Sequence, residues 1–171
     1  RRSLDTAFLV GGGPNYYHWI VEQSRNLKCY VDGGFDMPLL MSGPDLSPPQ
    51  REMLNLLGIE ARAYPWISRP CHIDCRHLFV TKDIFPGYGH DREHLDWIRD
   101  LFLGRKSLSQ DLESPTRIFI TRRNARARVI GEWEVEHALS SIGFTPVTAS
   151  GMTVSEQARL FSKAEVIVAG H

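Results

Sequence analysis

Short apolar runs alternate with amphipathic stretches along this chain, and the alternation restricts it to a small group of folds. Residues 6–12 (TAFLVGG) have the pattern of a strand that ends in glycines. Residues 15–30 (NYYHWIVEQSRNLKCY) carry apolar side chains near helical spacing, and the alternation continues to a last strand at 165–170 (EVIVAG). Because strands separated by helices pair in parallel through crossover connections, the predicted fold class is α/β with parallel sheets.

Capping signals mark where two of the helices begin and end. In SPPQREMLNLLG, Ser47 is expected to be the N-cap, Gln50 to complete a capping box, and Gly58 to end the helix. A second capping box is expected at Thr153 and Glu156. These signals fix the positions of two helices from local sequence alone.

The remaining elements of the first half follow from the same patterns. They are strands at 37–41, 59–63 and 76–81 and a helix at 91–104. In that helix, Leu95, Ile98 and Phe102 share one face, which predicts an amphipathic helix.

A polar segment at 104–116 (GRKSLSQDLESPT) is the best candidate for a domain boundary. It divides the chain into a Rossmann-like half at 1–103 and a second half at 117–171, with 104–116 as the linker. The second half repeats the alternation of strands and helices, so we expect two α/β domains.

The most unusual feature of the composition is local. Five arginines lie within twelve residues of RIFITRRNARARVIGEWEVE, and three glutamates follow at Glu132, Glu134 and Glu136. The whole chain has 20 Lys and Arg against 20 Asp and Glu, a formal net charge of zero. A neutral chain is a poor general binder of polyanions, so the arginine cluster indicates a local anion.

The position of the cluster indicates what it binds. In open α/β sheets, ligands lie at the carboxyl ends of the strands, and Arg122 and Arg123 directly follow the strand RIFIT. A guanidinium group matches phosphate oxygens bidentately, so we expect Arg122 and Arg126 to bind a diphosphate with Arg123 in support. Arg117 and Arg128 are expected to be peripheral. The alternative is a solvated loop whose arginines pair with the three glutamates.

A second candidate site follows the glycine-rich stretch GGGPN. His18 and Glu22 lie four residues apart in the predicted helix, so they share a face. Such a pair supplies a general base and the group that orients it. The alternative is a structural histidine beside a neighbouring acid.

Metal binding is not expected. The stretch CHIDCRH, residues 71–77, suggests zinc, but the second ligand pair that structural zinc sites use is missing and Cys29 stands alone. No Asp-x-Asp pair follows a strand to hold a divalent cation. We therefore expect arginines and helix N-termini to neutralise a bound diphosphate, with no cofactor.

The compartment and the extent of the chain are expectations of the same kind. No window approaches the roughly 20 apolar residues of a membrane span, and no leader opens the chain. Three cysteines suggest reduced thiols and a cytoplasmic protein, or a secretory lumen if an N-terminal anchor has been removed. The chain stops after a strand, so we expect a C-terminally truncated fragment.

Five segments, taken in order, resemble glycosyltransferase family 61. They are NYYHWIVEQSRNL, MPLL, PPQREMLNLLGI, RIFITRRNARARVIGEWEVEHALSSIGFTPV and MTVSEQARLFSKAEVIVAGH. The family includes bacterial capsular-polysaccharide-type transferases, plant xylosyl- and arabinosyltransferases and animal O-linked GlcNAc transferases. The resemblance implies a GT-B-like pair of Rossmann-like halves and an inverting, metal-independent transfer from a nucleotide-sugar, commonly a UDP-sugar, to a hydroxyl acceptor on a polysaccharide or other glycan.

The resemblance also implies roles for particular residues. ITRRNARAR matches the arginine-bearing donor loop, which gives Arg122 and Arg126 a diphosphate role. The terminal Gly170 and His171 match the start of another donor-site segment, whose backbone amides are expected to contribute. His18 or Glu22 becomes the expected base.

Two further expectations accompany the family resemblance. Glu132 or Glu134 is expected to orient the donor ribose or the arginines. The alternative function is a noncatalytic nucleotide- or glycan-binding domain on the same scaffold. A nucleic-acid binder is disfavoured because no array of aromatic side chains accompanies the arginines.

Overall fold

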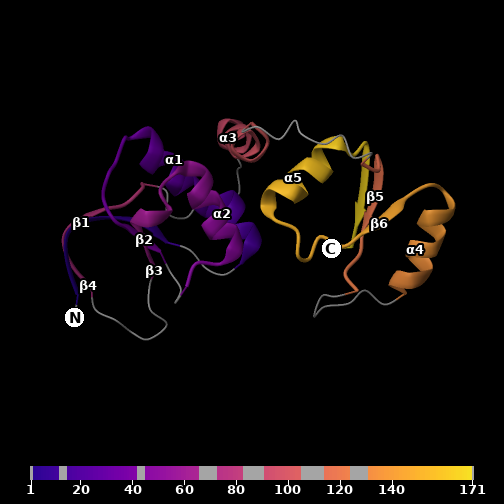
Figure 1. Ribbon diagram of the computed structural model, residues 1–171, viewed down its shortest axis with the longest axis horizontal. Coiled ribbons are helices and arrows are strands. Elements are labelled where there is room, and N and C mark those ends of the chain that lie inside the picture. The colour runs from indigo at the N-terminus through magenta and orange to yellow at the C-terminus, as the bar shows by residue number, and fades with distance from the viewer. Residues whose placement is uncertain are drawn as a thin grey trace. The chain divides into compact units, whose positions relative to one another are not determined.

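The computed structural model divides the chain into two compact units, Arg1–Phe102 and Leu103–His171. It describes residues 2–11, 15–41, 45–65, 73–82, 91–104, 114–123 and 131–170. Both units contain helices and a sheet (Figure 1), and each is described by itself below. Within these residues, no helix has the length and apolar character needed to cross a membrane.

Unit 1 is built on a parallel sheet of four strands. Its elements in chain order are β1 (Arg2–Gly11), η1 (His18–Gln23), α1 (Ser24–Asp32), β2 (Leu39–Met41), α2 (Pro48–Leu57), η2 (Glu60–Arg62), β3 (Ala63–Pro65), β4 (Ile73–Phe79) and α3 (Arg92–Leu103). The strand order is β3-β2-β1-β4, and every pair is parallel. The chain therefore builds the sheet outward from β1 to β3 and then returns to add β4 on the other side of β1.

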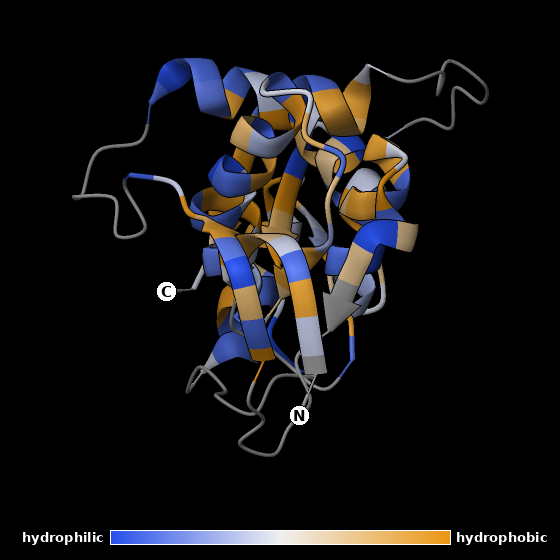
Figure 2. Cartoon of the chain, turned by 90° about the vertical axis from the view of Figure 1, so that its left-hand side faces the viewer, coloured by the Kyte–Doolittle hydropathy of each residue, from blue (hydrophilic) through white to orange (hydrophobic). Residues whose placement is uncertain are grey.

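Apolar side chains from β1, β2 and the first helices form the core of unit 1. Ala7, Leu27 and Tyr30 are fully buried, and the Phe8 ring meets the Tyr30 ring edge-on at 5.3 Å between centroids. The Tyr30 hydroxyl donates to the Met37 carbonyl at 2.7 Å, so its polar end is satisfied inside the core. The helices carry hydrophilic and hydrophobic stretches side by side, as one-sided burial requires (Figure 2).

The capping signals correspond to the observed helix ends. The Gln50 side chain accepts the backbone N–H of Ser47 at 2.8 Å, as in the predicted capping box. Gly58 follows α2 with φ of 73°, a left-handed conformation that favours glycine. In unit 2, Glu156 accepts the Thr153 N–H at 2.7 Å and the Glu156 N–H donates to the Thr153 hydroxyl at 3.2 Å.

Two predicted details of unit 1 were wrong. The strand predicted at 59–63 is mostly a turn of 3₁₀ helix, η2, and β3 begins only at Ala63. The apolar face predicted for α3 is also shifted, because Leu95 is 40% exposed whereas His94 is 1% exposed. His94 Nε2 lies 2.9 Å from the Ser24 hydroxyl of α1, and this hydrogen bond allows a polar residue to be buried.

Unit 2 is a smaller α/β layer. Its elements are β5 (Arg117–Ile120), α4 (Glu132–Ser141), β6 (Thr145–Val147), α5 (Val154–Lys163) and β7 (Val166–Ala169). The strands pair in parallel in the order β6-β5-β7, and α4 and α5 lie on opposite sides of the sheet (Figure 1). The predicted fold class, α/β with parallel sheets in both parts of the chain, is confirmed.

Candidate functional site

The carboxyl edge of the unit 2 sheet gathers the described part of the arginine segment. Ile120 pairs with Val147 on one side and with Ala169 on the other, so the residues after β5 and β7 meet at one edge. The chain passes from β5 to β6 on one side and then to β7 on the other side of β5. The strand order therefore reverses between β5 and β7, and such a switch point is where open α/β sheets bind ligands.

Arg122 lies at this switch point, two residues beyond the end of β5. Its backbone N–H donates to Oε1 of Glu132, the first residue of α4, whose side chain is buried at 8% exposure. The Arg122 side chain is half-buried, and within the described residues its guanidinium group forms no ion pair. The Arg122 backbone is therefore fixed, and among the described residues no acid pairs with its charged group.

Arg123 is held differently. Its Nη2 atom lies 2.5 Å from Oε1 of Glu136, one helical turn beyond Glu132. The Arg123 side chain is exposed and the Glu136 side chain is mostly buried. This part of the arginine segment thus matches the alternative in which arginines pair with glutamates, and a ligand would have to compete with Glu136 for Arg123.

The other predicted donor-site residues are distributed between the edge and the undescribed part of the chain. Gly170 follows β7 directly, at the switch-point edge. Arg126 and His171 lie outside the described residues. Arg117 is at the opposite end of β5, where its guanidinium group donates to the Ile142 carbonyl at 3.1 Å and stacks 4.9 Å from the centroid of Phe144.

Unit 1 has its own switch point, between β1 and β4, because β4 is added beside β1 on the side opposite β2. Asn26 of α1 holds the carboxyl ends of these two strands together. Its Nδ2 donates to the Val10 carbonyl at 2.8 Å, and its Oδ1 accepts the hydroxyl of Thr81 at 2.7 Å. The Asn26 side chain is buried and makes both bonds to uncharged groups, so this edge is fixed without charge.

His18 and Glu22 come a few residues after β1 in the chain. They lie in η1, a π-helical segment anchored by Trp19, which is 1% exposed. His18 Nδ1 lies 2.8 Å from Glu22 Oε2, with half of the His18 side chain exposed. If Nδ1 donates to the carboxylate, Nε2 carries the free lone pair and can accept a proton. A π-helical segment is an uncommon feature that is frequent at functional sites.

The geometry thus brings the sequence-predicted residues together in two groups. His18 contacts Glu22 in unit 1, and Arg122 and Arg123 contact α4 through Glu132 and Glu136 in unit 2. Asn26 and Thr81 were not predicted from the sequence. The only signal for Asn26 was a polar residue in the middle of a helix, where asparagine is unfavourable.

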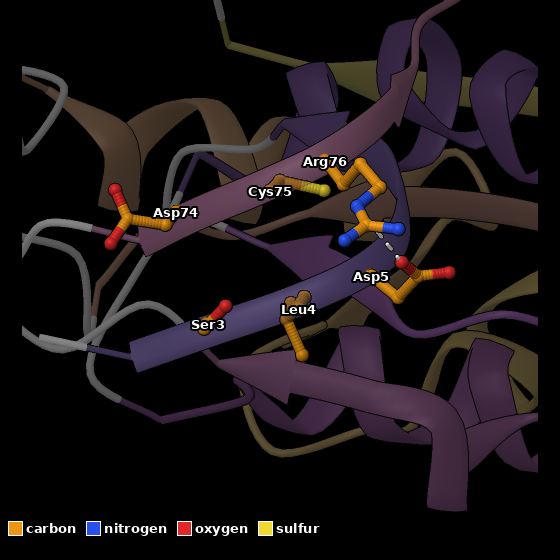
Figure 3. A pocket seen from close by; sticks show the side chains of 6 residues that line it. All are labelled: Ser3, Leu4, Asp5, Asp74, Cys75 and Arg76. Carbon is orange, nitrogen blue, oxygen red and sulfur yellow. Dashed lines mark ion pairs between the residues drawn. The ribbon is translucent and has the colours of Figure 1, made fainter.

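A separate pocket in unit 1 lies away from the switch point (Figure 3). Its volume is about 370 Å³, and it lies over the first halves of β1 and β4, where Arg76 Nε is 3.5 Å from Asp5 Oδ1. It is lined by Ser3, Leu4, Asp5, Asp74, Cys75 and Arg76. Both ion-paired side chains are mostly exposed, so this pocket is a surface hollow at the amino ends of the strands.

The cysteine–histidine stretch is only partly described. Cys71 and His72 lie outside the described residues, and the Cys75 thiol donates to the His77 carbonyl at 3.2 Å. Among the residues the structure describes, no group of three or more His, Cys, Asp and Glu side chains is arranged to hold a metal ion.

Comparison with known proteins gives one match. A family model described as Glycosyltransferase 61 matches residues 16–171. No curated protein and no solved structure matches the chain. The matched range begins after β1 and includes the whole unit 2 sheet, with His18 and Glu22 near its start and Gly170 near its end.

Proposed function

The chain belongs to glycosyltransferase family 61, and we propose that it moves a sugar from a nucleotide-sugar, a UDP-sugar by preference, to a hydroxyl group of a polysaccharide or other glycan. The observation that carries this proposal is Arg122, which follows the central strand at the unit 2 switch point and whose guanidinium group pairs with no acid among the described residues. A diphosphate is the part of such a donor that this group recognises best, because a guanidinium fork matches phosphate oxygens.

The donor diphosphate is the leaving group of the reaction, and negative charge grows on it in the transition state. Arg122 stabilises that charge, with Arg126 and the backbone amides near Gly170 and His171 as further donors. Loss of one preorganised donor of this kind typically lowers the rate by about 100-fold to 1000-fold. In the proposed mechanism, guanidinium groups neutralise the diphosphate in place of a metal ion, and the reaction needs no cofactor.

The acceptor is activated by the His18–Glu22 pair. The acceptor oxygen attacks the anomeric carbon from the face opposite the diphosphate, so the new C–O bond forms as the bond to the leaving phosphate oxygen breaks. The acceptor proton passes to His18 Nε2, and the Glu22 carboxylate at 2.8 Å stabilises the imidazolium that results. The anomeric configuration is inverted by this single displacement.

Nucleotide binding tests the donor assignment. UDP, GDP and inorganic pyrophosphate are titrated into the chain and into its Arg122→Ala and Arg126→Ala variants, with Arg117→Ala as a matched control from the other end of β5. We expect each of the first two variants to bind UDP about tenfold more weakly, since one charged hydrogen bond is worth about that factor. Equal affinity in all three variants would contradict the assignment.

Turnover tests the base and separates the enzyme from the noncatalytic alternative. His18→Ala and Glu22→Gln are expected to lose sugar transfer and donor hydrolysis while binding UDP as tightly as the unchanged chain. Full turnover in both variants would remove this pair from the mechanism. Tight UDP binding with neither transfer nor hydrolysis in the unchanged chain would favour a nucleotide-binding domain without chemistry.

A further inference from the structure

Two carboxylates in the first half of α4 connect this helix to the residues that follow β5. Glu132 accepts the backbone N–H of Arg122, and Glu136 accepts the guanidinium group of Arg123 at 2.5 Å. We call Glu132 and Glu136 the glutamate clasp. Because they are four residues apart on one helix, both face the same side and reach consecutive residues of the arginine segment.

The two members of the glutamate clasp differ in burial. Glu132 is a buried residue, and its partner is a backbone amide. The Arg123 side chain is 59% exposed, and exposed ion pairs contribute little to stability. A hydrogen bond to a buried carboxylate is stronger than an exposed ion pair because water competes with it less. Glu132 is therefore the member that fixes the arginine segment.

The Glu132 carboxylate also lies where many α/β proteins bind a phosphate group. A free amide at the end of a central strand and the first turn of the next helix together bind anions in such folds. Here the Glu132 carboxylate has taken the Arg122 amide and lies in the first turn of α4, with Glu134 beside it. Among the described residues, the start of α4 is thus occupied by its own carboxylate, which leaves the Arg122 side chain and the backbone after β7 to hold an anion at this edge.

We propose that Glu132 is a positioning residue, which fixes Arg122 for the donor diphosphate through the Arg122 backbone amide and does not itself contact the nucleotide. The inference rests on the proposed donor role of Arg122. It decides between the two roles expected for Glu132, because a buried carboxylate already bonded to Arg122 orients the arginine rather than the ribose. Glu134 is in the same turn but exposed, so it provides a matched comparison.

The test combines UDP titration with amide exchange. Glu132→Ala is expected to bind UDP about tenfold more weakly, whereas Glu132→Gln, whose amide oxygen can accept the same N–H, stays within about threefold of the unchanged chain. Glu134→Ala is expected to stay within about twofold, since exposed charges contribute little. Adding Glu132→Ala to Arg122→Ala should weaken binding no further than Arg122→Ala alone, because both changes remove one interaction.

The second readout needs no nucleotide. Hydrogen exchange at the Arg122 amide should be slow in the unchanged chain and in Glu132→Gln, and fast in Glu132→Ala, while urea unfolding checks that each variant is folded. Equal losses of affinity in Glu132→Gln and Glu132→Ala, or additive losses in the double variant, would overturn the positioning role. Unchanged exchange in Glu132→Ala would overturn it as well.

Failure of the proposed function has a different signature. If the unchanged chain binds no UDP, GDP or pyrophosphate, or if Arg122→Ala binds them as well as the unchanged chain does, the donor role of Arg122 is wrong and no diphosphate is positioned. The exchange measurement would still show whether Glu132 holds the Arg122 amide.

Discussion

The two units fix equivalent edges of their sheets by opposite means. At the carboxyl edge of unit 1, the neutral Asn26 side chain joins the Val10 carbonyl to the Thr81 hydroxyl. At the carboxyl edge of unit 2, the Glu132 and Glu136 carboxylates hold the backbone of Arg122 and the side chain of Arg123. One edge is thus organised without charge and the other by a dense set of charges.

The same difference recurs in the helix caps. The capping box of α2 in unit 1 uses Gln50, and that of α5 in unit 2 uses Glu156. Hydrogen bonds between neutral groups contribute the same stability as pH and salt change, whereas the contribution of charged groups depends on both. This fits the proposed division of labour, because only the donor side has to hold an anion and release it.

The largest expected effect comes from breaking the neutral edge. Asn26→Ala removes both buried hydrogen bonds and leaves the Val10 carbonyl without its partner, so we expect a loss of about 3 kcal/mol in the free energy of unfolding. Urea unfolding measures it. Thr81→Val removes only one of the two bonds and should lose about half as much. Equal stability of Asn26→Ala and the unchanged chain would show that this bridge does not hold β1 and β4.

Two glycines in left-handed conformations, one in each unit, allow a second comparison. Gly131 precedes α4 with φ of 74°, and Gly58 follows α2 with φ of 73°. Alanine at either position should lower the free energy of unfolding by about 1 to 2 kcal/mol because of the backbone conformation.

Nucleotide binding separates these two variants. Gly131→Ala should also weaken UDP binding, since Gly131 sets the start of the helix that carries the glutamate clasp, whereas Gly58→Ala should not. A loss of UDP affinity in both variants would point to a general loss of folded protein.

A smaller effect is expected from the exposed member of the clasp. Glu136→Gln removes the ion pair with Arg123, which is 59% exposed, so the free energy of unfolding should fall by less than about 1 kcal/mol. The same change frees Arg123, so UDP should bind at least as tightly as before. Weaker UDP binding in Glu136→Gln would show that Arg123 works only while Glu136 holds it.

The smallest effect is a pH dependence confined to the charged cap. Hydrogen bonds from the Thr153 backbone N–H and the Thr153 hydroxyl lower the pKa of Glu156 below its ordinary value of 4.5. A carboxyl with a lowered folded pKa contributes stability above its unfolded pKa and loses it as pH falls through the folded value. The Glu156→Gln variant should therefore lose less stability than the unchanged chain on acidification below 4.5.

Unfolding midpoints at a series of pH values measure this difference. Gln50→Ala in unit 1 is the control, because the cap it removes carries no charge and its loss should be the same at every pH. A Glu156→Gln variant with an unchanged acid response would remove Glu156 from the pH dependence.

Local sequence signals predicted most of the fold. The alternation of strands and helices and the two capping boxes depend on neighbouring residues, and they gave the α/β class and most element positions. The start of β1 was missed, because Arg2 and Ser3 belong to the strand only through pairing with Ile73 and Asp74 far along the chain. Propensity alone does not assign polar residues to a strand.

The candidate site was predictable in part. The position of Arg122 after an apolar strand and the spacing of His18 and Glu22 are visible in the sequence. The glutamates beside the arginines are visible as well, but the partners within unit 1 are not, because Asn26 reaches residues 16 and 55 positions away and His94 reaches Ser24 across 70 positions. Such contacts form only when the sheet has formed, so hydropathy patterns in the sequence do not predict them.

The π-helical segment η1 makes the orientation of His18 sensitive to the number of residues that precede it in the chain. In an α-helix each residue turns the chain by about 100°, so a π-helical stretch accommodates extra chain within the same rise. Deleting one residue between Asn15 and His18 would change the direction in which the His18 imidazole points, although His18 and Glu22 are both retained. The number of residues before His18 therefore determines its orientation. Insertions and deletions change that number, whereas point substitutions do not.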